Sequence, residues 1–318
     1  MTNQISRRKF IQKSSLIGAG AFFSSLIVPR SIEAAGLFGR PDICIYHGKN
    51  HYTGTLRAIE KLGGIKKFID SGDKVGLLVN SDFEILGAYP HADIVLAVLK
   101  ECYEQEASQI ACIQNIKPEY WKRGDHYQEN KDYVSRIINN PDNTFPSKYN
   151  PKTFTRLDKI DGAKCLKKVE ITKAILECDK FISISIAKHH ALTLYTGALK
   201  NMMGVGTREN NVYYHLGSEK RNDPDFLGQC IADINMLRQP DLILIDGTEF
   251  ITTNGPVGPG ETKIADKIFA GTDLVAMDCL GAETLGYQPE EIVMIKKAEA
   301  CGLGTSDLSS LKIKEIHD

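Results

Sequence analysis

The sequence lacks several patterns that would identify a protein class at once. Its 318 residues carry a formal net charge of -1 and no dense basic stripe, so there is no electrostatic reason to expect a nucleic acid partner. It contains no C-x-x-C pair, no G-x-S-x-G, no H-E-x-x-H and no G-K-[ST] after a glycine-rich loop. The common motifs of zinc ribbons, serine hydrolases, metalloproteases and nucleotide-binding loops are therefore excluded.

The cysteines also lack the spacing of a cluster. There are eight, at positions 44, 102, 112, 165, 178, 230, 279 and 301. A ferredoxin-type cluster needs closely spaced thiolates on one loop, so no iron–sulfur cluster is predicted. Most of the cysteines sit in apolar surroundings, which favours buried free thiols, although export would permit disulfides.

The first 35 residues differ in character from the rest. The segment "SRRKFIQK" precedes an uncharged run at 14–28 and then "PRSIEAAG", the order of a secretory signal. Arg7 and Arg8 resemble the paired arginines of the bacterial twin-arginine signal, which a receptor reads. We therefore expect a signal peptide at 1–35, cleavage near Ala34, contact with the twin-arginine export machinery, and a periplasmic or otherwise exported protein. The alternative is a retained anchor, but 15 residues fall short of the roughly 20 that a stable membrane span needs.

Apolar runs typical of strands then alternate with segments of helical period. We expect strands at 42–48, 74–80, 109–114, 181–187 and 241–247, and helices at 55–70, 91–107, 171–178, 191–203, 225–237 and 272–286. Such alternation predicts an α/β fold with parallel-rich sheets and flanking helices. A polar, aromatic excursion at about 115–161 interrupts it. We therefore expect two Rossmann-like lobes, 36–160 and 161–318, with the excursion in the first.

The most informative stretch follows the apolar run that begins at Phe181. That run ends in Lys188, His189 and His190, and in open α/β sheets ligands bind outside the carboxyl ends of the strands. Lys188 could hold a carboxylate or phosphate, or act as a base; His189 could be a general acid/base or a metal ligand. Adjacent histidines point in different directions, so only one is expected in the site. The competing interpretation is a solvated loop.

Two further segments place polar groups near the expected ends of strands. Asp246 ends one strand and is followed by the loop "GTEFITTNGPVGPG", in which Asn254, Gly255 and Gly258 could approach a ligand closely or form an ordinary turn. Asn80 ends another strand, where turn formers are also common.

Two more polar residues fall within predicted helices. Asn201 lies near the end of one of them and could equally be a cap partner. Asp278 sits among apolar neighbours in "FAGTDLVAMDCLGAETLG". A buried carboxylate needs a partner, and Lys188 or His189 would be natural ones.

Together these motifs resemble domain of unknown function family 362. The corresponding segments are Lys188 and His189, then "TGALKNMMG", then "DGTEFITTNGPVGPG", then "AGTDLVAMDCLGAETLG". The resemblance implies that Lys188, His189, Asn201, Asn254 and Asp278 line one site, and it supplies no reaction. Some relatives carry an added iron–sulfur module that this chain lacks. The order of elements is also similar in outline to the lactate racemase family, whose lysine and histidines hold a nickel cofactor.

The first hypothesis is an exported enzyme or binding protein for a small anionic ligand or metal cofactor. Lys188 would bind the anion, His189 would be the acid/base or metal ligand, and Asp278 would orient them. The remaining candidate ligand-binding residues are Asn80, Asn201, Asp246, Asn254, Gly255 and Gly258.

Two alternatives stay open. One is a non-catalytic binding or maturation protein for an exported redox complex, with a partner surface on the aromatic excursion around the single tryptophan, Trp121. The other is an α/β protein in which the polar cluster is only a structural network. The cofactor, if any, is not specified by the sequence.

Overall fold

The computed structural model describes residues 40–139 and 151–318. The expected signal peptide at 1–35 and part of the polar excursion lie outside these ranges. Residues from Arg40 to Asp318 form one compact unit, and the description below concerns that unit.

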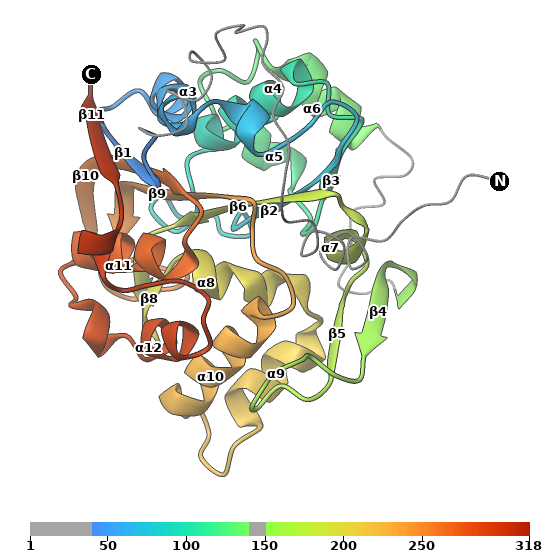
Figure 1. Ribbon diagram of the computed structural model, residues 1–318, viewed down its shortest axis with the longest axis vertical. Helices are drawn as coiled ribbons and strands as arrows, with labels where there is room; N and C mark the ends of the chain where they lie inside the picture. Colours follow the sequence, from blue (N-terminus) through green and yellow to red (C-terminus); the bar gives the residue numbers. More distant parts are fainter. Residues whose placement is uncertain (1–39, 140–150) are drawn as a thin grey trace, which may run out of the picture. The chain divides into compact units, whose positions relative to one another are not determined.

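A seven-stranded sheet forms its centre, in the order β11-β1-β10-β9-β6-β2-β3 (Figure 1). Its strands are β1 (Ile43–His47), β2 (Lys74–Val79), β3 (Gln109–Cys112), β6 (Lys180–Ile186), β9 (Leu242–Ile251), β10 (Thr262–Gly271) and β11 (Ile313–His317). In this sheet only β10 runs antiparallel to its neighbours. The predicted α/β class with a parallel-rich sheet is therefore confirmed. Two-stranded sheets pair β4 (Phe154–Leu157) with β5 (Val169–Thr172), and β7 (Lys188–His190) with β8 (Leu194–Thr196).

Helices cover both faces of the sheet, as expected. One face carries α3 (His51–Leu62), α4 (Ala92–Glu104), α5 (Pro118–Trp121) and α6 (Lys131–Ile138). The other carries α7 (Ala174–Glu177), α8 (Ala198–Asn201), α9 (Arg208–Leu216), α10 (Pro224–Asn235), α11 (Leu274–Leu285) and α12 (Val293–Ala300). Short 3-10 turns are η1 (Ile65–Lys67), η2 (Pro151–Thr153), η3 (Met202–Val205), η4 (Pro289–Glu291) and η5 (Leu308–Ser310).

Alternation along the strands builds a core on each face. In β1, Ile43 and Ile45 belong to the cluster under α11 and α12, whereas Cys44 and Tyr46 belong to the cluster under α3 and α4. Successive side chains of a strand point to opposite faces. Strands buried on both faces read as continuous apolar runs, which is why the sequence located them.

The strand directions fix where a site can form. Strands β1, β2, β3, β6, β9 and β11 run the same way, so their carboxyl ends meet at one edge of the sheet. Ligands of open α/β sheets bind outside that edge. Most of the residues singled out by the sequence follow these strand ends.

The expected helix at 191–203 is wrong for most of its length. The chain instead forms the hairpin β7–β8, in which Lys188 pairs with Thr196 and His190 with Leu194. Leu194 takes a positive φ of 62° in the turn, and only α8 and η3 follow as helical turns. Tyr195 and Thr196 favour strands because their side chains fit a pleated surface.

Strands from 36–160 and from 161–318 pair within the one central sheet. The position between residues 160 and 161 therefore does not divide that sheet. All eight cysteines are free, and six of them are buried, as the apolar surroundings predicted.

Candidate functional site

A cavity of about 460 Å³ opens beside the carboxyl ends of β2, β3 and β6. Asn80 follows β2, Gln114 lies two residues beyond β3, and His190 comes from the β7–β8 hairpin. The lining residues are Asn80, Asp82, Phe83, Gln114, His190, Lys200, Asn201, Met203, Gly204, Gly206, Thr207, Arg208, Asn211, His215 and Pro256. Its position is the one expected for a ligand site in this class of sheet.

The cavity wall carries more positive than negative charge. Lys200 comes from α8 and Arg208 from the first turn of α9, whereas Asp82 is the only carboxylate in the lining. Asp82 accepts a hydrogen bond of 2.7 Å from the amide of Gln114. Electrostatics in the cavity therefore favour an anion.

Lys200 is the most informative of these charges. Its side chain is half-buried, and within the described residues no hydrogen bond or ion pair is formed by its ammonium. Burial lowers the pKa of Lys200 to about 8. Partial burial of a charge is unfavourable without a negative or hydrogen-bond-accepting partner, and the cavity that Lys200 lines has room for one.

His190 is held in one tautomer and can donate a hydrogen bond to a ligand. Its Nδ1 accepts hydrogen bonds of 3.2 Å from the backbone N–H groups of Leu192 and Thr193. Burial, and next the charge of Lys200, lower the pKa of His190 to about 2. The neutral ring must then carry its proton on Nε2, and that atom is the one left to donate to a ligand.

Two asparagines singled out by the sequence line the same cavity. The Asn201 amide donates to the Ser183 hydroxyl at 2.9 Å and to the carbonyls of Leu78 and Ile184 at 3.3 Å. These bonds tie α8 to β2 and β6. Asn80 donates its backbone N–H to the Ile184 carbonyl.

Lys188 lies behind the cavity wall and is fully buried. Its Nζ donates to the carbonyls of Ala88 at 2.6 Å and Pro256 at 2.8 Å, and it lies 3.4 Å from the centre of the Phe83 ring. Burial, and then Lys200, lower the pKa of Lys188 to about 6. Since Phe83 and Pro256 line the cavity, Lys188 holds two wall residues together.

His189 and the glycine-rich loop contact each other beside this wall. The Gly255 N–H donates to His189 Nδ1 at 3.0 Å, and burial lowers the pKa of His189. Asn254, with a φ of 53°, donates its amide to the Pro259 carbonyl and accepts from the N–H of Gly258. These loop residues form a turn, and none of the four residues His189, Asn254, Gly255 and Gly258 lines the cavity.

Asp246 belongs to a separate polar cluster. Its carboxylate accepts from the N–H of His91 at 2.6 Å and from the N–H and hydroxyl of Thr248 at 2.8 and 2.6 Å. His51 Nε2 lies 3.2 Å from the same hydroxyl, and the rings of His51 and His91 stack 3.9 Å apart. Because the Thr248 hydroxyl donates to Asp246, it must accept from His51.

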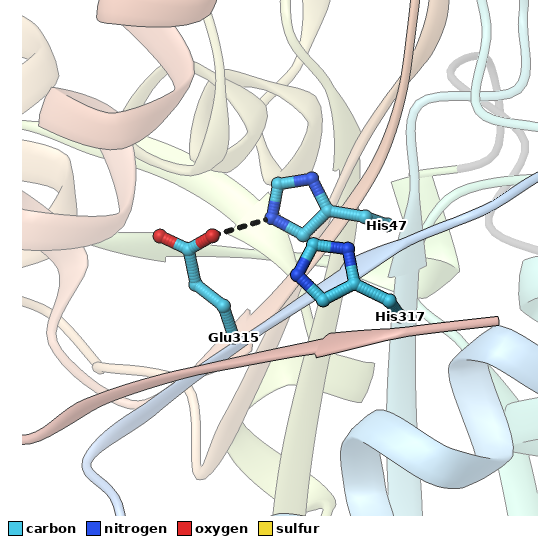
Figure 2. Close-up of side chains that lie close together, drawn as sticks. All are labelled: His47, Glu315 and His317. Carbon is cyan, nitrogen blue, oxygen red and sulfur yellow. Dashed lines mark ion pairs between the residues drawn. The ribbon is translucent and has the colours of Figure 1, made fainter.

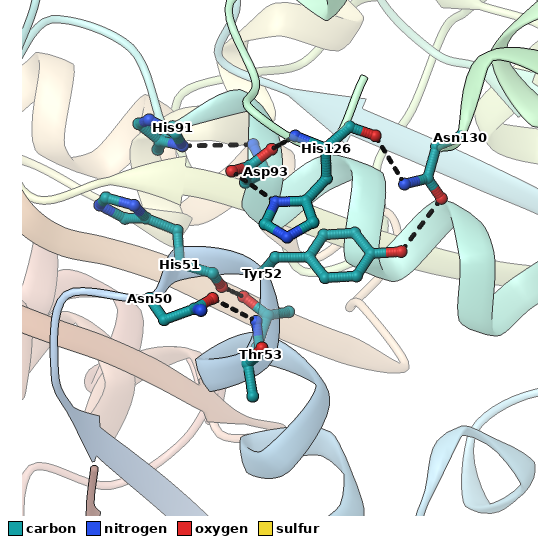
Figure 3. Close-up of polar contacts among 9 residues, drawn as sticks. Asn50, His51, Tyr52, Thr53, His91, Asp93, His126 and Asn130 are labelled. Atoms are coloured by element: carbon teal, nitrogen blue, oxygen red, sulfur yellow. Dashed lines mark hydrogen bonds and ion pairs between the residues drawn. The ribbon is translucent and has the colours of Figure 1, made fainter. Parts of the chain in front are cut away.

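A second polar network involves residues of α3 and α4 and of the segment before α6 (Figure 3). Asp93 pairs with His126 at 3.1 Å, and the Tyr52 ring stacks on His126 at 4.2 Å. The Tyr52 hydroxyl donates to Asn130, whose amide donates to the His126 carbonyl. This network joins α3, α4 and the segment before α6.

Asp278 is fully buried in α11. Its carboxylate accepts from the N–H groups of Ala198 at 2.6 Å and Leu199 at 3.1 Å, in the first turn of α8. Burial raises the pKa of Asp278 to about 7, although those two N–H groups oppose the shift. The expected pairing with Lys188 or His189 is therefore replaced by backbone partners.

The structure thus brings Asn80 and Asn201 together in one cavity, with Lys188 directly behind its wall. It adds Lys200, His190 and Arg208, which sequence reasoning did not select. Lys200 stands next to Asn201 within the family motif, and that adjacency was the available signal. Arg208 belongs to a helix, α9, that the sequence pattern did not reveal.

A different set of residues has the donors for a metal. His47, Glu315 and His317 each offer one ligand atom, and these atoms lie within 4.8 Å of one another (Figure 2). Across residues 40–139 and 151–318, no helix has the length and apolar character needed to cross a membrane.

Comparisons with known proteins identify the family. The sequence profile described as Domain of unknown function (DUF362) matches residues 87–283. This range is more than half of the chain, which therefore belongs to that family. No curated protein sequence matches the chain.

Two solved structures are similar to parts of this fold. The lactate racemase apoprotein from Thermoanaerobacterium thermosaccharolyticum has a TM-score of 0.45 and 14% identity over 76% of this chain. A protein from Thermotoga maritima has a TM-score of 0.39 and 12% identity over 80% of this chain. The present chain spans 56% and 58% of the lengths of those proteins.

Proposed function

We propose that this protein binds a small anionic ligand in the cavity beside the carboxyl ends of β2, β3 and β6. The observation that carries the proposal is the half-buried ammonium of Lys200, which has no acceptor within the described residues and faces a cavity with Arg208 and His190. The cavity volume of about 460 Å³ lies in the range of small-molecule sites.

Physical chemistry gives each of these side chains a role. An anion beside Lys200 would offset the unfavourable burial of its charge. Arg208 would supply a planar pair of donors suited to a carboxylate or phosphate. His190, neutral and protonated on Nε2, would donate a third hydrogen bond without adding charge.

The residues first expected to be catalytic take supporting positions in this proposal. Lys188 would position Phe83 and Pro256 through its contacts with them. His189 would hold the Gly255 loop, and Asp278 would hold the first turn of α8, which carries Lys200. The proposal is therefore one of ligand binding, in which residues of α8, α9 and the β7–β8 hairpin contact the ligand.

Isothermal titration calorimetry at pH 7 tests this proposal, with inorganic phosphate and malonate as two probes of different anion chemistry. We expect at least one to bind. Lys200→Met and Arg208→Gln should each weaken binding about tenfold or more, because a hydrogen bond to a charged group contributes about 1.5–3 kcal/mol.

Lys296→Met is the matched control, since Lys296 is exposed on α12 and does not line the cavity. It should bind the probe as the unmodified chain does. Failure of both anions to bind, or equal binding by the Lys200 and Lys296 variants, would contradict the proposal.

We also propose that the protein is exported by the twin-arginine route. The support is in the sequence, where Arg7 and Arg8 precede an uncharged run at 14–28. Replacing both arginines by lysine should retain the uncleaved protein in the cytoplasm, as seen by cell fractionation and immunoblotting. Unchanged processing and export of that variant would contradict this route.

A further inference from the structure

Three side chains gather at the opposite end of the carboxyl edge, on β1 and the edge strand β11. The parallel register pairs His47 with His317. Glu315 precedes His317 by two residues, so both project from one face of β11. His47 projects beside them from the same face of β1, and a histidine pair and a carboxylate therefore share one surface.

The polar atoms of these three side chains lie close together. His47 Nε2 lies 2.9 Å from a Glu315 carboxylate oxygen, and the rings of His47 and His317 stack 4.6 Å apart. Figure 2 shows a nitrogen of each ring turned toward the carboxylate. Yet His47 Nε2 is buried and makes no hydrogen bond of good geometry within the described chain, which is uncommon for a buried nitrogen.

We propose that His47, Glu315 and His317 bind a divalent transition-metal ion of the Zn²⁺ class. Two imidazoles and a carboxylate suit zinc, nickel or cobalt, whereas magnesium and calcium prefer oxygen ligands alone. In a tetrahedral zinc site the ligand atoms are about 3.3 Å apart. The three atoms lie within 4.8 Å of one another, so small side-chain rotations bring them to that spacing.

The exposure of the ligands and the charges around them indicate that a metal ion bound here could exchange with solution. Glu315 and His317 are exposed, and three protein ligands leave at least one position for water or another ligand. Lys267, the partner of His47 on β10, adds a positive charge on this face. The carboxylate of Glu315 offsets that charge and is therefore needed for binding.

The backbone that carries His317 is held in place by contacts outside the cluster. Arg57 donates to the His317 carbonyl at 2.8 Å, and the Tyr46 hydroxyl donates to Asp318 at 2.5 Å. The Asp318 N–H in turn donates to the His47 carbonyl. These bonds fix the register of β11 on β1, so a metal ion would meet ligands already placed by the backbone.

Calorimetric titration of the untagged full chain with Zn²⁺ tests the proposal. We expect a site that His317→Ala and Glu315→Gln each weaken at least about tenfold, since even outer-shell changes reach that size. Mg²⁺ should not compete. With Co²⁺ as the probe, the visible absorption of nitrogen and oxygen ligation should appear and be lost in both variants.

Two controls separate this site from other effects. His215→Ala removes a histidine of α9 and should leave Zn²⁺ affinity unchanged. Lys200→Met should also leave it unchanged, because that variant affects only the proposed anion cavity. Equal Zn²⁺ affinity in the unmodified chain and both ligand variants, or equal affinity for Mg²⁺, would overturn the proposal.

Discussion

Burial shifts three titratable side chains toward their neutral forms. The pKa of Lys188 falls to about 6, that of His190 falls to about 2, and that of Asp278 rises to about 7. In each, loss of water around the charged form is the main cause. Each group also forms hydrogen bonds with backbone N–H or carbonyl groups. These bonds hold loops and helix ends in place, while burial disfavours the charged form of the side chain.

Lys188 should make stability depend on pH. Its pKa falls from an ordinary 10.5 to about 6 on folding, so the unfolded chain binds more protons between those values. The free energy of unfolding should therefore rise with pH from about 6 upward. Urea denaturation at several pH values should show a smaller rise for Lys188→Met, whereas Lys296→Met should keep it. Identical slopes in all three proteins would refute this.

Asp278 should change the free energy of unfolding with pH in the direction opposite to that of Lys188. Its pKa rises from an ordinary 3.8 to about 7, so its contribution is full below pH 3.8 and is lost as pH rises through 7. Asp278→Asn cannot titrate and should flatten that part of the profile. The free energy of unfolding of this variant should also be lower by about 1–3 kcal/mol, because one N–H at the start of α8 loses its acceptor. A decline of equal steepness in the variant, measured by denaturation, would contradict the assignment.

At the scale of elements, the sequence located the buried strands well. Runs such as Leu77 to Val79 and Leu242 to Ile245 are apolar because both faces of the sheet are covered. The sequence could not locate β11, because its IKEIH pattern leaves most side chains partly or fully exposed. The metal-ligand set was missed for that reason, since two of its three members lie on β11.

The site was predicted at the right edge of the sheet but with only part of its residues. Asn80 and Asn201 could be selected because each adjoins a recognisable element. His190 could not be distinguished from His189 by pattern, since which of two adjacent side chains enters a cavity depends on the hairpin. The hairpin was not predicted, because the sequence pattern at 191–203 was interpreted as a helix.

The Gly255 loop offers a test of how tightly elements pack at this edge. A Cβ at position 255 would overlap the carbonyl of His189, so Gly255→Ala must displace backbone. Gly302, with a φ of 73° and open space around it, is the control, where alanine meets only the left-handed backbone cost of about 1–2 kcal/mol. Thermal unfolding should show the larger loss for Gly255→Ala, and an equal or smaller loss would contradict the packing described.

At the scale of the whole unit, strand order separates two candidate sites along one edge. The cavity lies beside β2, β3 and β6, whereas His47, Glu315 and His317 lie on β1 and β11. Strands β9 and β10 run between them. The anion cavity and the metal cluster are therefore expected to bind independently.

Ligand binding should be coupled to proton uptake. The pKa of Lys200 is lowered to about 8, and a bound anion favours its charged form. Anion affinity should therefore be highest below pH 8 and fall as pH rises through it, with net proton uptake near that pH. Calorimetry in two buffers of different ionisation enthalpy measures this uptake. Affinity that rises with pH in this window would contradict a role for Lys200.

Anomalous diffraction from crystals soaked in selenate tests the central claim most directly, because selenium locates a bound tetrahedral anion without ambiguity. We predict a peak within hydrogen-bonding reach of Lys200 Nζ and His190 Nε2, absent in Lys200→Met crystals soaked alike. Selenate bound only outside this cavity, or equally in the Lys200→Met protein, would contradict the account.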